Sequence, residues 1–152
     1  MTIVGYSGRA LTIRMTPDQQ HIIGQTIVTY LALKTTAVFR RCHPPHLAHI
    51  EPQSLCDKII SQYTASDPEV PVFDEVFTTL DVTEWGSCLF ILNVAAYGCA
   101  ISANDLYCLS GFRHSEVGAT MVALHDQIEK HVYKLAATES IRLRRESVAD
   151  GE

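Results

Sequence analysis

The chain has 152 residues, of which 47% are hydrophobic and 19% are charged, and its formal net charge is −5. A chain of this length fits one domain, which can bury about 68–70% of the surface that the unfolded chain exposes. The acidic balance argues against a surface for nucleic acid or for anionic membrane. We expect a single domain over residues 1–152, with flexible ends at 1–15 and 142–152.

The two ends of the chain and its cysteines bear on its location. The first fifteen residues lack a basic leader followed by a long apolar stretch, so we expect no secretory signal. The C-terminal ESVADGE is neither a prenylation box nor an apolar anchor, and we expect no stable membrane anchor. Five cysteines without a CxxC pair favour free thiols in a reduced cytoplasmic protein.

The first strong element is a helix that begins after Thr16. The segments TIVGYS and ALTIRM before it alternate only weakly, and we expect no strand there. Thr16 and Gln19 can form a capping box, and Pro17 suits the first helical position. An apolar stripe then follows at helical spacing: Ile23, Ile27, Tyr30, Leu31 and Lys34. The two prolines of RRCHPPH end this helix.

Four further segments show helical spacing. A helix from Pro52 carries Leu55, Ile59, Ile60 and Tyr63, and a helix over 73–80 carries Phe73, Val76, Phe77 and Leu80. A short turn of helix ends near Gly111. The last helix, capped by Ser115, has the stripe Val117, Met121, Leu124, Ile128, Val132 and Leu135, and the basic tail after it is a frayed end. The pattern predicts an all-α bundle of about six to eight helices.

No charged side chain occurs from Trp85 to Asn104, a stretch as long as a membrane span. The flanking residues Asp81, Glu84 and Asp105 are acidic, whereas a span normally has Lys or Arg at one end. The amphipathic segments around it also need a surface against which to bury their stripes. We therefore expect a central helix, buried on every side, rather than a span.

Residues 73–102, FDEVFTTLDVTEWGSCLFILNVAAYGCAIS, resemble the most diagnostic part of the Bcl-2 family of apoptosis regulators. In that family an amphipathic helix and a short turn precede Asn/Glu-Trp-Gly-Arg, which opens a long apolar central helix. Glu84-Trp85-Gly86-Ser87 match this tetrapeptide. Residues 25–34 are similar to the family's first helix, and residues 55–63 resemble a weakened death-motif helix.

Three departures accompany the resemblance. Ser87 stands where the family has Arg, residues 125–140 lack the family's second Gly-Gly-Trp-type cluster, and we expect no C-terminal anchor. A compact, anchorless and divergent member of this kind looks most like the homologues carried by large DNA viruses.

The resemblance implies a Bcl-2-like helical bundle around a central buried hydrophobic helix. It also implies an inhibitor of apoptosis that holds the death-motif helix of Bim-type proteins in a hydrophobic surface groove. The expected ligand-groove residues are Ile59, Ile60, Tyr63, Phe73, Val76, Phe77, Leu80, Glu84, Gly86 and Ser87. Trp85 is expected to anchor the central helix. No enzyme activity and no cofactor are implied, and an exposed apolar groove can also pair two copies in a homodimer.

Ser87 in place of Arg predicts narrow ligand selectivity, because a hydrogen bond to a charged group contributes about 1.5–3 kcal/mol. Lys58 or Arg113 are alternative cations for the same role. Two other functions stay open: a pro-apoptotic protein of the same fold, and a helical protein with a metal site at Cys42, His43, His46 and His49. The irregular CHPPHLAH run favours a solvated loop over zinc. His125 and Glu129 are expected to form a surface pair.

Overall fold

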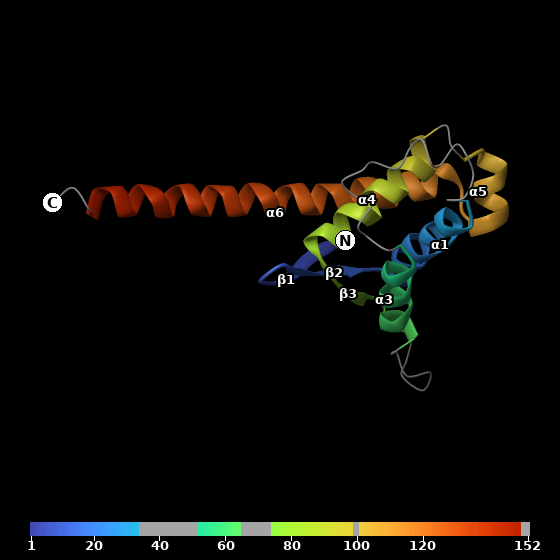
Figure 1. The fold of residues 1–152 in the computed structure, drawn as a ribbon, viewed down its shortest axis with the longest axis horizontal. Helices are drawn as coiled ribbons and strands as arrows, with labels where there is room; N and C mark the ends of the chain where they lie inside the picture. The colour runs from blue at the N-terminus through green and yellow to red at the C-terminus, as the bar shows by residue number, and fades with distance from the viewer. Residues whose placement is uncertain (34–51, 65–73, 99–100, 150–152) are drawn as a thin grey trace.

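The structure, a computed structural model, describes residues 1–33, 52–64, 74–98 and 101–149, with the side chains of 52, 63–64 and 136–149 left aside. These residues form five helices and a three-stranded antiparallel sheet (Figure 1). The protein is therefore mostly helical, as expected, but the all-α class is wrong because of the sheet. The Bcl-2-like arrangement stays a prediction.

The sheet begins with a hairpin that the sequence analysis did not predict. Strands β1 (Thr2–Ser7) and β2 (Ala10–Met15) pair antiparallel and turn at Gly8, whose φ of 59° is the left-handed conformation that favours glycine. Leu11, Ile13 and Met15 are buried, while the residues between them are partly exposed. The weak alternation of ALTIRM is thus a true strand period, and most of the end expected to be flexible, 1–15, lies in two strands. Its flexibility stays a prediction.

The segment predicted as a helix over 73–80 contributes strand β3 (Val76–Asp81), which pairs with β2 along its whole length. Thr78 and Leu80 are buried and Phe77 and Thr79 are exposed, which is the period of two of a strand. The β-branched and aromatic residues of VFTT favour a strand once β2 offers backbone partners. Spacing alone could not reveal that partner.

The helices are α1 (Pro17–Leu33), α3 (Pro52–Thr64), α4 (Val82–Tyr97), α5 (Ala103–Ser110) and α6 (His114–Ala149). The capping box at the start of α1 is confirmed, since the N–H of Gln19 donates to Thr16 Oγ1 at 3.2 Å and the N–H of Thr16 donates to Gln19 Oε1 at 3.1 Å. Helix α5 ends at Gly111, as predicted. Helix α6 continues through Ala149, over the segment expected to be a frayed end, and the flexibility of this end stays a prediction.

Helix α4 lies at the centre of the core. Its buried residues are Trp85, Ser87, Cys88, Ile91, Leu92, Val94, Ala95 and Ala96. Tyr97 is nevertheless 62% exposed and Asn93 is exposed, so the helix is not buried on every side. Among the described residues, no helix has both the length and the apolar character needed to cross a membrane. Figure 1 shows α6 running alongside α4 and then extending well beyond the rest of the molecule.

Candidate functional site

Three residues of the Glu84-Trp85-Gly86-Ser87 tetrapeptide make bonds within the protein. The Glu84 carboxylate accepts from the backbone N–H of Asp81 at 2.9 Å and so completes a capping box at the start of α4. Trp85 is fully buried, and its Nε1–H donates to the carbonyl oxygen of Leu11 in β2 at 3.0 Å. Ser87 is buried and donates to the carbonyl oxygen of Thr83 at 3.3 Å. Ser87 therefore lies in the interior, away from any surface groove.

Glu84 also joins α4 to α3. Its second carboxylate oxygen pairs with Lys58, one of the two cations considered as a substitute for the family Arg. Because Lys58 is engaged by the protein's own carboxylate, its charge is already matched at the start of α4. The structure thus gives both Lys58 and Glu84 a role in holding two helices together.

The other expected groove residues do not gather on one surface. Ile59 and Leu80 are each 2% exposed and belong to the core. Ile60, 45% exposed, and Phe77, 56% exposed, are at the surface, and Val76 is half-buried. Tyr63 belongs to α3 but its side chain is among those left aside, and Phe73 lies outside the described residues.

Val76 and Phe77 line a pocket of about 840 Å³. Its wall also contains Arg14, Gln62 and Glu75, and Arg14 Nε lies 3.5 Å from a carboxylate oxygen of Glu75. The surface is mixed in polarity, and an internal ion pair occupies part of it. A wall of this kind suits a polar contact better than the apolar face of a helix.

A second surface, which the sequence analysis missed, lies between α4 and α6. A pocket of about 450 Å³ there has Leu89, Phe90 and Asn93 on one side. Met121, Val122 and His125 of α6 form the other side. We call this surface the α4/α6 groove. Its walls are mostly apolar, and Val122 is exposed even though it lies next to the core-facing stripe of α6.

Gly86 lies on α4 one turn before Phe90 of the groove wall. The Tyr97 ring lies against Gly118, where an added Cβ would be 2.7 Å from the hydroxyl oxygen, and Asn93 and His125 share the pocket. The two helices therefore run antiparallel, and Gly86 lies near the level of Glu129. A Cβ at Gly86 would meet nothing within 4 Å. Gly86, expected to allow close approach of a ligand, thus borders open space, although it is not itself among the residues that line the pocket.

The sequence contained a signal for this face. Gly86, Asn93 and Tyr97 recur at helical spacing within the uncharged stretch, and all three are at least partly exposed. Asn93, a polar residue in an apolar helix, marked the side that is not covered. Interpreting the whole stretch as fully buried hid that signal.

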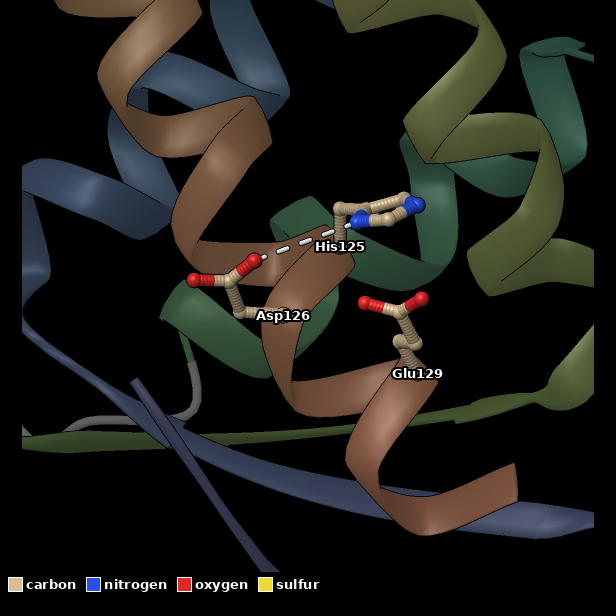
Figure 2. Close-up of side chains that lie close together, drawn as sticks. All are labelled: His125, Asp126 and Glu129. Atoms are coloured by element: carbon tan, nitrogen blue, oxygen red, sulfur yellow. Dashed lines mark ion pairs between the residues drawn. The ribbon is translucent and has the colours of Figure 1, made fainter. Parts of the chain in front are cut away.

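Some of the histidines and cysteines considered in the sequence analysis lie among the described residues, and others lie outside them. Cys42, His43, His46 and His49 lie outside the described residues. The predicted pair of His125 and Glu129 is brought together with Asp126, and one ligand atom of each lies within 4.8 Å of the others (Figure 2). Cys56, Cys88 and Cys108 are free thiols, in agreement with the expectation.

No protein-family model, no curated protein and no solved structure matches this chain. The function is therefore argued from the surface geometry and from the chemistry of the residues that form it.

Proposed function

We propose that the protein is a binding module that holds an amphipathic helix of a partner protein in the α4/α6 groove. The observation that carries the proposal is the α4/α6 groove itself, whose apolar walls include Leu89, Phe90, Met121 and Val122. Helix-in-groove recognition uses walls of this kind, which receive apolar anchors from successive turns of the ligand helix. The proposal needs no catalytic step and no cofactor.

The energetics favour a helical ligand with a few large apolar anchors. Complete burial of one Leu, Ile or Phe side chain contributes about 1.5–3 kcal/mol, so two or three anchors can offset the loss of freedom on association. Gly86 adds room for the ligand backbone, because no side chain projects from α4 at that position. The same apolar walls can accept a second copy of the chain, which makes a homodimer the competing occupant.

The specific partner that we propose is the death-motif helix of Bim-type proteins, with suppression of host cell death in the cytosol as the result. The support is the tetrapeptide Glu84-Trp85-Gly86-Ser87 at the start of the apolar helix α4 and the open space beside Gly86. In the family an Arg at this position pairs with the ligand. Ser87 is buried here, so this position provides no surface cation for the ligand. Recognition would then depend on the apolar anchors, and selectivity would be narrow.

The test is calorimetric titration of Bim-type death-motif peptides into the protein and into three variants. Val122→Asp places a charge on the groove wall, and Gly86→Glu fills its open end, so both should reduce affinity at least tenfold. Gly86→Ala is the matched control. It should keep binding and raise the free energy of unfolding by about 0.5–1 kcal/mol, because alanine favours the helix.

Phe77→Asp separates the two exposed apolar surfaces. Phe77 lines the mixed pocket beside β3 rather than the α4/α6 groove, so this variant should bind the peptide as the natural protein does. Loss of binding in Phe77→Asp with full binding in Val122→Asp would move the site to β3 and contradict the proposal. Sedimentation of the free protein shows whether a second copy already occupies the groove.

A further inference from the structure

The α4/α6 groove has an acidic border on its α6 side. His125 forms part of the groove wall, and Asp126 and Glu129 lie beside it, all three exposed to solvent. Figure 2 shows the carboxylates of Asp126 and Glu129 close to the His125 imidazole, with a dashed line between His125 and Asp126. His125 Nδ1 lies 3.9 Å from a carboxylate oxygen of Asp126. We call Asp126 and Glu129 the acidic rim.

Within the described part of the chain, no lysine or arginine forms an ion pair with either residue of the acidic rim. The nearest lysines in sequence, Lys130 and Lys134, line a separate pocket against strand β1 together with His131. Lys130 and Lys134 thus lie against β1, while Asp126 and Glu129 lie beside the groove residue His125. Among the described residues, no lysine or arginine within ion-pair distance neutralises this negative edge.

On the basis of the proposed function, we infer that the partner helix carries a Lys or Arg at the edge of its apolar face, and that this cation pairs with Asp126 and Glu129. Complementary charge at the rim of an apolar contact fixes the register of the bound helix and favours partners of the right sign. This polarity is the reverse of the one that the Bcl-2 resemblance implies, where the cation belongs to the groove. The interior position of Ser87 and the exposed carboxylates of the acidic rim, which form no ion pair with a described lysine or arginine, both support the reversal.

The expected effect is moderate because the rim is exposed. Solvent-exposed ion pairs change an affinity by up to about fivefold, and salt screens them. The apolar anchors would supply most of the affinity, and the rim would set the preference among partners. A preference of this origin must shrink as the salt concentration rises.

The experiment uses two designed Leu-based amphipathic peptides that differ at one position on the edge of the apolar face, Arg in one and Gln in the other. Each is titrated into the protein at low and at high salt, with a chelator present because His125, Asp126 and Glu129 can also hold a divalent cation. The Arg peptide should bind about three- to fivefold more tightly at low salt. The double variant Asp126→Asn/Glu129→Gln should lose this preference while it still binds both peptides.

The matched control is Asp74→Asn/Glu75→Gln, which removes the same two charges at the distant pocket beside β3. It should keep the preference for Arg. If the natural protein binds both peptides equally, or if the control loses the preference as well, the inference is overturned while the groove stands. Binding of neither peptide, with Val122→Asp indistinguishable from the natural protein, overturns the groove and the rim together.

Discussion

Asp81 links the end of β3 to the start of α4 through its charge. Hydrogen bonds from Thr83, first from its backbone N–H at 2.7 Å, hold the pKa of Asp81 below its usual range, and the nearby Arg9 guanidinium acts in the same direction. A carboxylate at this position also interacts favourably with the positive end of the helix dipole. The residue therefore stabilises the folded state in its ionised form.

We expect the stability that Asp81 contributes to depend on pH. Its pKa is lower in the folded state than in the unfolded chain, where it is about 3.9. The contribution is therefore complete above about pH 5 and disappears as the pH falls through the folded pKa. Asp81→Asn, which keeps a good N-cap but no charge, should have a lower urea midpoint than the natural protein at pH 7.

The difference between Asp81→Asn and the natural protein should narrow as the pH falls from 5 towards 3, as measured by urea unfolding at each pH. Asp81→Ala, which also removes the cap, should be less stable than Asp81→Asn at every pH. A gap between Asp81→Asn and the natural protein that stays constant over this range would show that the charge does not stabilise the fold.

At the scale of elements, the edge of β3 is covered by one side chain. Gln62 of α3 accepts from the N–H of Thr79 at 2.7 Å and donates to its carbonyl oxygen at 3.0 Å. Its amide thus makes the two bonds that a residue of a neighbouring strand would make. Unpaired strand edges promote association between chains, so this contact protects the sheet.

Gln62→Ala should expose the edge of β3 and promote self-association. The expected result is a concentration-dependent rise in sedimentation coefficient, or slow aggregation on storage, with little change in the helical circular dichroism. Gln53→Ala is the control, since Gln53 lies on the same helix and bonds only to the exposed Asp57. Equal behaviour of the two variants would show that the Gln62 contact does not protect the sheet.

The sequence predicted elements with local signals better than elements with distant partners. Thr16, Pro17 and Gln19 mark the start of α1, and the structure confirms it, because capping depends on neighbouring residues only. Val76 to Leu80 fit a helix and a strand equally well in spacing. The segment is a strand because it pairs with β2, which lies more than sixty residues earlier in the chain. The α4/α6 groove has the same origin, since its walls belong to two helices that only the fold brings together.

At the scale of the whole molecule, the described core is a single cluster that includes residues from α1, α3, α4, α5, α6 and the sheet. Cys88 lies within it, and burial raises the pKa of its thiol well above the usual value. Burial also raises the pKa of Cys56, and the neighbouring Asp57 adds to the shift. Cys108 is exposed. The reactivity of Cys56 and Cys88, compared with that of Cys108, should therefore report the unfolding of the core.

We expect iodoacetamide to modify Cys108 rapidly in the native protein. Cys56 and Cys88 should react only as the protein unfolds, because the thiolate is the reactive form and both thiols are buried. Peptide mapping by mass spectrometry over time measures each site separately, and the rates in urea give the control for the fully accessible thiols. Rapid modification of Cys88 under native conditions would contradict the packing of α4 in the core.

The carboxylate of Glu84 makes two structural contacts at once. One oxygen holds the backbone where β3 becomes α4, and the other holds Lys58 of α3. If a partner bound at Ile60 and displaced α3, the Glu84 carboxylate would couple that displacement to the first turn of α4. Gly86 lies in the next turn of α4, so binding at α3 is coupled through Glu84 to the helix that forms one wall of the α4/α6 groove.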